Sequence, residues 1–190
     1  MDQGDGSDPQ DGGTAATGRR AAVLESALTT FARFGYRRTS MDEVARAAAI
    51  SRPGLYFLFD SKAALFRAAA AHALERDLTT VERVLAATDR PLRDRVLDAF
   101  DAWAGRYTGP LARDVSTVVE DNPELLGDLV ETTSGRFAAL LTEALASAGT
   151  ARADPVARTA ISTSVGVKHQ VDARADYRDR MAVALELLLR

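Results

Sequence analysis

The sequence predicts an all-α protein of about nine helices, in which a small N-terminal domain precedes a larger helical domain. Ala and Leu, which are strong helix formers, dominate the hydrophobic 46% of the chain, and β-branched runs are short and scattered. Apolar residues recur at three- and four-residue spacing in one segment after another, and capping or helix-breaking residues separate these segments. No strand pattern competes with this fold class.

Composition excludes several classes of protein. The chain contains no cysteine, so disulfides, thiol chemistry and cysteine-ligated metals are excluded, and its two histidines lie far apart in sequence. We expect no metal site, no cofactor and no catalytic site. No apolar run reaches the ~18 residues of a membrane span, and the N-terminus lacks the basic and apolar regions of a signal peptide. The expected location is the cytoplasm, without a membrane partner.

Charge is distributed unevenly along a chain whose net charge is −3. Residues 1–18 carry four Asp and no base, residues 19–67 carry nine bases against four acids, and the remainder carries 15 bases against 19 acids. A basic segment attached to an acidic body is the electrostatic layout of a DNA-binding domain. Ordinary scatter of charge remains the alternative at this point.

The N-terminal elements are expected in the following order. Residues 1–17, rich in Gly and Asp, are expected to form a disordered acidic tail. A first helix is expected from Arg19, ending at Gly35, where glycine suits a left-handed helix stop. The DNA-binding domain is expected to cover 18–64, with its motif at about 40–59.

The motif consists of two short helices. The first is expected from 41 to about 48, with Thr39 or Ser40 as its N-cap and an acid three residues later. The second is expected from 52 to about 59, with Ser51 as its N-cap and a proline in its first turn.

The remainder, 65–190, is expected to be a ligand-binding and dimerisation domain. Its helices, the first of which starts just before the boundary, are expected at about 61–87, 91–107, 110–120, 123–148, 154–172 and 175–190.

Two short helices joined by a tight turn, supported by a preceding helix and embedded in basic sequence, are typical of a helix-turn-helix. The second helix of such a motif places its N-terminal residues in the major groove, and free amides at helix N-termini attract phosphate. A helical hairpin with ordinary caps has the same pattern, so helix lengths alone leave both interpretations open.

The stretch from Phe34 to Phe66 resembles the DNA-binding signature of the tetracycline-repressor (TetR/AcrR) family. The matching parts, in the same order, are Phe34-Gly35-Tyr36, Thr39-Ser40, Val44-Ala45, Ala48, Ser51, Leu55-Tyr56, Phe59, Ser61-Lys62 and Leu65-Phe66. The resemblance implies a homodimeric transcriptional regulator that binds a palindromic double-stranded operator. It also implies that a small apolar or amphipathic effector releases the operator, which is the behaviour of a repressor.

The resemblance assigns DNA contacts to nine positions. They are Thr39, Ser40, Ser51, Arg52, Pro53, Gly54, Tyr56, Phe57 and Lys62. Thr39, Ser40 and Tyr56 are expected to contact phosphate, and Lys62 is expected to clamp the DNA backbone. Arg52 is the best candidate for reading guanine, because its fork can bond O6 and N7 together.

Three departures from the family pattern affect this motif. Ala49 stands where the family usually has glycine, which strains the turn if a positive φ is required. Pro53-Gly54 replaces a Gly-Thr-like pair, and Phe57 and Leu58 make the face more apolar, so thymine-methyl contacts are expected to replace hydrogen bonds.

A ligand cavity and a dimer interface are expected in the C-terminal domain. The expected ligand-binding residues are Phe100, Trp103, Tyr107, Val130, Phe137 and His72, with Arg106, Thr133 and His169 as further polar candidates. The expected dimer residues are Ala157, Ile161, Ser164, Val165, Lys168, Met181, Leu185 and Leu188. A plain aromatic core and packing within one subunit are the respective alternatives.

An enzyme is the main competing class of function. The sequence contains no nucleophile elbow, phosphate-binding loop or zinc-protease helix motif, and no cysteine nucleophile. A helical small-molecule-binding or enzymatic domain without specific DNA binding therefore stays as the alternative, together with a helical protein-interaction module.

Overall fold

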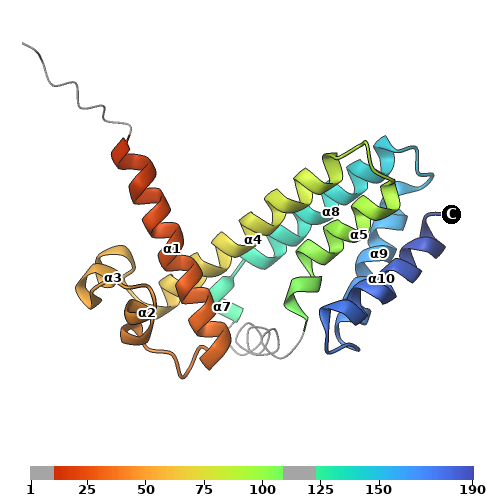
Figure 1. Cartoon of the computed structure of the whole chain (residues 1–190). Helices are drawn as coiled ribbons and strands as arrows, with labels where there is room; N and C mark the ends of the chain where they lie inside the picture. The colour runs from red at the N-terminus through yellow and green to blue at the C-terminus, as the bar shows by residue number, and fades with distance from the viewer. Residues whose placement is uncertain (1–10, 109–122) are drawn as a thin grey trace, which may run out of the picture. The chain divides into compact units, whose positions relative to one another are not determined.

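The computed structural model describes residues 11–108 and 123–190, and every regular element within them is helical (Figure 1), which confirms the all-α prediction. The elements are α1 (Asp11–Phe34), α2 (Met41–Ala47), α3 (Arg52–Leu58), α4 (Lys62–Ala86), α5 (Leu92–Trp103), the 3-10 helix η1 (Gly105–Tyr107), α7 (Pro123–Leu126), α8 (Leu129–Ser147), α9 (Ala153–Lys168) and α10 (Arg174–Leu188). The helix expected at 110–120 lies outside the described residues.

The chain divides into two compact units, which we call the head (up to His72) and the body (from Ala73). The boundary lies inside α4, eight residues later than the expected boundary between 64 and 65. The physical reason is that Phe66, on the second turn of α4, packs its ring edge-on against Phe31 of α1, with ring centres 5.2 Å apart. The first turns of α4 therefore belong to the core of the head.

The core of the head includes aromatic rings that contact one another and aliphatic side chains from α2 and α3. Tyr36 contacts both Phe31 and Phe66, with ring centres 5.7 Å and 5.2 Å apart. Val44 from α2 and Leu55 from α3 are both completely buried. Each such side chain contributes about 1.5–3 kcal/mol when it leaves water, which is enough to hold two helices of only seven residues in place.

Helix α1 begins at Asp11 and not at Arg19, so the prediction of a disordered tail was wrong for residues 11–17. Nucleation of a helix is costly, whereas each further residue gains a hydrogen bond at little cost. Buried Ala27 and Phe31 anchor the helix near its C-terminal end, and the backbone continues outward from there. The helix ends as predicted, with Gly35 at φ +78°.

Ala49, in the turn between α2 and α3, has a φ of +53°. This left-handed conformation costs an L-residue roughly 1–2 kcal/mol, which is the strain expected from the missing glycine. Two backbone hydrogen bonds hold the turn in place, from Ala49 N–H to Arg46 O at 3.2 Å and from Ile50 N–H to Ala45 O at 3.0 Å.

Replacing Ala49 with glycine is expected to raise the free energy of unfolding by about 0.5–1 kcal/mol. The substitution removes the left-handed penalty, while the greater freedom of glycine in the unfolded chain offsets part of the gain. Urea denaturation measures the change. Ala22, exposed in the middle of α1, is the matched control, and Ala22→Gly is expected to lower stability by about 1 kcal/mol. Equal losses in both variants would contradict the strain at Ala49.

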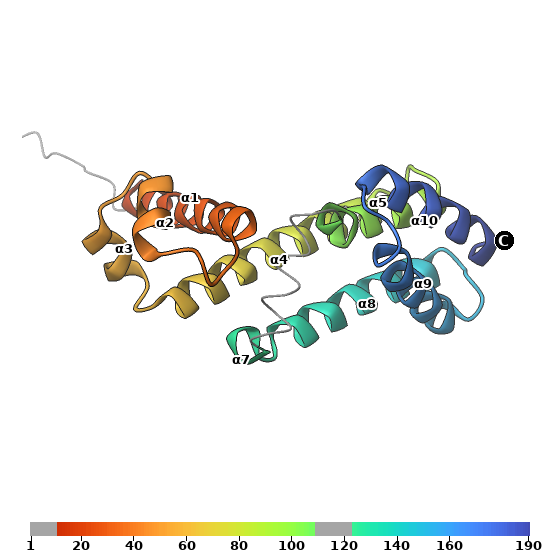
Figure 2. The ribbon, with the colours of Figure 1, turned by 90° about the horizontal axis from the view of Figure 1, so that it is seen from below.

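The body is built from the later part of α4 together with α5, α8, α9 and α10. Helix α9 packs on α8 and on α10, and α10 packs on α5 (Figure 2). One apolar core receives side chains from all five helices, and its largest fully buried members are Leu78, Phe100, Phe137, Leu141, Leu145, Tyr177, Met181 and Leu185.

A network of ion pairs fixes α10 against α5. Arg174 forms two hydrogen bonds to Asp101, both 2.8 Å long, and Arg178 donates to Asp98 at 2.5 Å and to Asp101 at 3.2 Å. Burial by itself would raise the pKa of Asp98, but hydrogen bonds from Arg178 and Arg90 outweigh it, and the pKa is lowered. The network sets which side of α10 faces outward.

Two expected helices of the body are interrupted at glycines. The helix predicted over 123–148 breaks at Gly127, which has a φ of +52°, and becomes α7 and α8. The helix predicted over 91–107 ends at Trp103 and continues as η1. A Cβ on Gly105 would lie 2.5 Å from Asp101 Oδ1 and 3.0 Å from the Tyr177 ring, so only glycine allows η1 to pack this closely.

Candidate nucleic-acid interface

Helix α2 begins with the predicted capping box at Ser40. The Ser40 hydroxyl accepts the Glu43 N–H at 3.2 Å, and the Ser40 N–H donates to the Glu43 carboxylate at 2.7 Å. The hydrogen bond from the Ser40 backbone is the largest of the effects that lower the pKa of Glu43. The cap leaves Ser40 exposed at the N-terminus of the first motif helix.

Helix α3 begins with the predicted N-cap at Ser51. Its hydroxyl accepts the Gly54 N–H at 3.1 Å, and Pro53 lies in the first turn, where its missing amide costs nothing. A Cβ on Gly54 would lie 3.0 Å from the Ser51 hydroxyl and crowd the cap. Glycine at 54 therefore serves the same cap that positions the start of α3.

The outward face of α3 is aromatic. The Phe57 side chain is 89% exposed and the Tyr56 side chain 40% exposed, whereas Leu55 and Phe59 on the opposite face are buried. A phenylalanine that remains almost wholly in water forgoes about 1.5–3 kcal/mol of burial. A contact surface for an external partner accounts for its placement.

Arg52, in the first turn of α3, is held by a residue that the sequence did not single out. Its Nε lies 3.1 Å from Asp42 Oδ1, its NH1 donates to Asp42 Oδ2 at 3.3 Å, and its guanidinium lies 5.7 Å from the Tyr56 ring centre. The side chains of Arg52 and Asp42 are both more than half exposed. Such a surface pair contributes about 0–1 kcal/mol, so a better partner for the fork displaces Asp42 at small cost.

Thr39 was wrongly predicted to contact phosphate. Its side chain is only 2% exposed, and its hydroxyl donates to the Gly35 carbonyl at 2.8 Å. The reason is the extended backbone just before α2, in which successive side chains point in opposite directions. Ser40 therefore points outward and Thr39 points into the core.

Lys62, which was predicted to clamp the DNA backbone, bonds the loop between α1 and α2 in this structure. Its ammonium donates to the carbonyls of Tyr36 at 2.9 Å and Thr39 at 3.1 Å, reaches that of Arg37 at 3.5 Å, and lies 4.5 Å from the Tyr36 ring centre. Lys62 thus clamps the loop between α1 and α2, because carbonyls without helical partners compete for its three donors.

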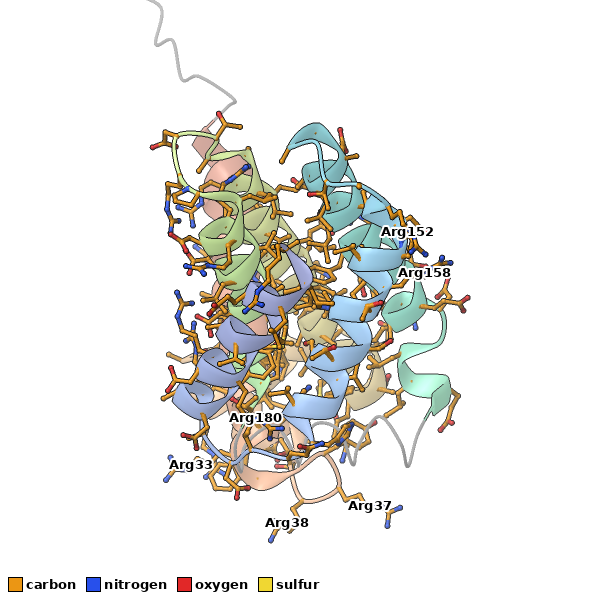
Figure 3. The ribbon with its side chains drawn as sticks, turned by 90° about the vertical axis from the view of Figure 1, so that its right-hand side faces the viewer. Arg33, Arg37, Arg38, Arg152, Arg158 and Arg180 are labelled. Carbon is orange, nitrogen blue, oxygen red and sulfur yellow. The ribbon has the colours of Figure 1, made fainter. Side chains whose placement is uncertain are left out.

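Two exposed arginines in that loop add phosphate candidates that sequence reasoning missed. Arg37 and Arg38 project into solvent (Figure 3), and Arg38 Nε donates to the Phe34 carbonyl at 3.0 Å. Their basic, exposed positions beside the cap at Ser40 were the available signal.

The expected ligand face of the body is largely an aromatic core. Phe100 and Phe137 are buried, with ring centres 5.3 Å apart, and Trp103 stacks on Phe137 at 5.1 Å with an 8° interplanar angle. Val130, which was predicted to join this group, is 41% exposed and lies outside the core. The break at Gly127 changes the phase of α8 relative to the predicted helix.

His72, which was predicted for the ligand site, is the last residue of the head, where its Nε2 lies 3.4 Å from a Glu25 carboxylate oxygen. The head also has a surface groove of about 560 Å³, bordered mainly by charged and hydroxyl side chains of α1 and α2.

A buried carboxylate in the body escaped sequence reasoning. Asp77 of α4 is fully buried, accepts a hydrogen bond from Tyr107 Oη at 2.5 Å, and pairs with Arg106 and Arg76. Burial first, and then the bond to Asp77, raise the pKa of Tyr107. The ammonium of Lys168, at the end of α9, lies over the Tyr107 ring, 5.8 Å from its centre.

Several predicted dimer residues are buried within the chain. Ala157, Ser164, Met181 and Leu185 are each at most 4% exposed, and the Ser164 hydroxyl bonds the Tyr177 hydroxyl at 2.7 Å. Assigning these four to a dimer interface was wrong, because an amphipathic helix first covers its most apolar face inside its own chain.

The outer faces of α9 and α10 nevertheless remain apolar. Val165, Val183 and Leu187 are 54%, 60% and 59% exposed. The other predicted dimer residues, Ile161, Lys168 and Leu188, are partly buried. Figure 3 looks onto these two helices, with Arg158 and Arg180 at their surface.

Within the described residues, no group of acidic or histidine side chains forms a metal cage. No helix among them is both long and apolar enough to cross a bilayer.

Comparisons with known proteins agree with this geometry. Residues 23–69 match the family model described as bacterial regulatory proteins of the tetR family. The HTH-type transcriptional regulator RutR of Escherichia coli is 36% identical over 52 residues, 27% of this chain and 24% of RutR. The HTH-type transcriptional repressor ComR of Escherichia coli is 27% identical over 126 residues, 63% of this chain and 58% of ComR.

The similarity of fold extends beyond the head. A TetR transcription regulator from Haloarcula marismortui superposes with a TM-score of 0.72 at 14% identity, covering 91% of this chain and 97% of that one. By sequence, the chain spans about a quarter of RutR and somewhat more than half of ComR. The family model thus matches within the head, and the similarity of fold covers nearly the whole chain.

Proposed function

We propose that this chain is a DNA-binding transcriptional regulator of the tetR family of bacterial regulatory proteins and not an enzyme. The proposal rests mainly on the exposed surface of α3. The side chains of Arg52 and Phe57 lie outside the core there, on the helix that begins after the N-cap at Ser51. A helix-turn-helix uses this part of its second helix to contact bases.

The roles of the interface residues follow from their chemistry. Arg52 exchanges Asp42 for O6 and N7 of a guanine, and the Phe57 ring contacts thymine methyl groups. Tyr56, Ser40 and the N-terminal amides of the two motif helices bond phosphates. Pro53 and Gly54 let the backbone of α3 approach the groove closely.

The regulator acts as a homodimer through the outer faces of α9 and α10. The exposed side chains of Val165, Val183 and Leu187 support this assignment, because a second copy would remove them from water. Two heads then bind half-sites of a palindromic operator about 34–36 Å apart, one turn of DNA. A single short helix contacts too few bases for useful specificity.

An effector bound in the body releases the operator, which makes the protein a repressor in the cytoplasm, where its operator lies. Helix α4 supports this coupling, because it contributes its first eleven residues to the head and the rest to the body. The relative ComR carries the name of a repressor. A coupling of about 1–3 kcal/mol between effector and operator is sufficient for a switch.

Operator selection from random DNA tests the proposal. The purified protein is expected to enrich a palindrome with half-sites about one helical turn apart. Arg52→Ala is expected to relax selection at one base of each half-site, since a bidentate contact discriminates by about 1–3 kcal/mol. The exposed Arg93 of α5 provides the control, and Arg93→Ala is expected to enrich the wild-type sequence. No enrichment at low salt by an intact dimer would favour a helical small-molecule-binding or enzymatic domain without DNA binding.

A further inference from the structure

We propose that the effector is an organic anion, a carboxylate carried on an aromatic or apolar body, and that it binds beside Asp77 with its charge on Lys168 and Arg106. The inference rests on the proposed function for its regulatory meaning, while the binding itself is measured without DNA. It names the chemistry of the effector, for which the family membership of the head gives no indication.

The site is organised around the buried carboxylate of Asp77. Tyr107 donates its hydroxyl to one oxygen at 2.5 Å, and Arg106 pairs with the other. Arg76, one residue earlier on α4, lies 3.4 Å from that second oxygen. Asp77 has no exposed surface, whereas Arg76 and Arg106 are each 38% exposed. The Arg106 guanidinium is therefore partly accessible from solvent.

Two cations lie near this carboxylate in a domain that is acidic overall. Arg106 pairs with Asp77, and Lys168 lies over the ring of Tyr107, which donates to Asp77, whereas residues 68–190 carry 15 bases against 19 acids. Elsewhere in the body, arginines on the surface of the core meet matching acids, as Arg136 does with Glu75 at 2.6 Å.

Lys168 is the cation that most needs a partner. It is mostly buried at the end of α9, and burial lowers the pKa of its ammonium. Across 11–108 and 123–190 no carboxylate pairs with it, and its one recorded contact is the Tyr107 ring. A shielded ammonium without an anion is unfavourable, and an incoming carboxylate would relieve that cost.

The neighbouring surface suits an aromatic or apolar body. Trp103 lies one helical turn before Tyr107, and both rings are partly exposed. One face of Trp103 already stacks on Phe137. A planar ligand whose carboxylate pairs with Lys168 would lie against the rings at this edge of the core, where area burial adds to the charge contact.

The same contacts connect the ligand to α4. A carboxylate that engages Arg106 competes with Asp77 for its guanidinium, and Asp77 is carried by the helix whose first turns belong to the head. The effector thereby stabilises an arrangement of α4 different from that of the free protein, which is the differential interaction that a switch requires.

Two probes of equal shape and different charge test the inference on the full-length protein. Sodium 2-naphthoate and the neutral 2-naphthamide share one ring system and differ in the carboxylate. Binding is measured by calorimetry and by the emission of Trp103, the single tryptophan of the chain. Naphthoate is expected to bind at least about tenfold more tightly than naphthamide, as charge-assisted hydrogen bonds imply.

Substitutions at Lys168 locate the anion. Lys168→Met is expected to weaken naphthoate binding about tenfold or more and to leave naphthamide binding unchanged, whereas Lys168→Arg retains naphthoate binding. Arg158→Met removes a cation from the exposed surface of the same helix (Figure 3) and is expected to change neither affinity. Thermal unfolding confirms that each variant is folded.

Each outcome decides the inference. Equal affinities for the two probes, no binding of either at millimolar concentration, or the same effect of Lys168→Met and Arg158→Met would overturn it. Binding of naphthoate that depends on Lys168 supports it even if no operator is found, in which case only the proposed function fails. Release of a selected operator by naphthoate, and not by naphthamide, supports both.

Discussion

Replacing Leu187 with aspartate is expected to lower operator affinity at least about 100-fold while leaving each subunit folded. Leu187 is 59% exposed, so the change disturbs little within the chain. In the proposed dimer, however, it places an unpaired charge in an apolar interface, which costs several kcal/mol. A monomer then binds one half-site and loses the second. Analytical ultracentrifugation and gel retardation on the selected operator measure the two effects.

Ala139 provides the control for this experiment. It is exposed on α8, outside the outer faces of α9 and α10, and Ala139→Asp introduces the same charge there. That variant is expected to remain dimeric and to bind the operator as the wild type does. If Leu187→Asp stayed dimeric, or bound the operator normally as a monomer, the interface would have to lie elsewhere.

Replacing Arg106 with methionine is expected to lower the free energy of unfolding by about 3 kcal/mol, the typical cost of removing one partner of a buried ion pair. The methionine keeps most of the volume but leaves Asp77, which has no exposed surface, without its main counter-ion. The melting temperature is expected to fall by roughly 6–12 °C for a chain of this size. Differential scanning calorimetry at neutral pH measures both quantities.

A double variant separates loss of the ion pair from loss of packing. Asp77→Asn together with Arg106→Met is expected to be more stable than Arg106→Met alone, because the double variant no longer buries an unpaired carboxylate. Tyr107→Phe, which removes one hydrogen bond to Asp77, is expected to cost about 1–2 kcal/mol. If the double variant were less stable than the single one, packing of Arg106 and not its charge would explain the loss.

Local signals in the sequence were sufficient for the architecture of the motif. The hydroxyls of Ser40 and Ser51 cap α2 and α3 as predicted, because a cap depends on residues within one turn of it. The strain at Ala49 was also predictable, since a two-helix turn that usually holds glycine requires a positive φ. These properties depend on residues that are neighbours along the chain.

The errors share a different physical origin. Thr39 was expected on the DNA side, but packing of the loop between α1 and α2 turned it inward. Met181 was expected in a dimer and lies in the core of its own subunit. Helical periodicity shows that a face is apolar, and it does not show which surface covers that face.

The sequence by itself determined the all-α class, the position and caps of the helix-turn-helix, and the basic character of residues 19–67, because propensity, capping and charge are local properties. Only the tertiary structure decided which acid meets which base. Arg52 pairs with Asp42 from a different helix, and Arg106 pairs with Asp77 from 29 residues away. It also decided that Val183 and Leu187 stay exposed on α10. Such pairings depend on how whole helices pack, and that packing is set by the summed burial of many side chains distant in sequence.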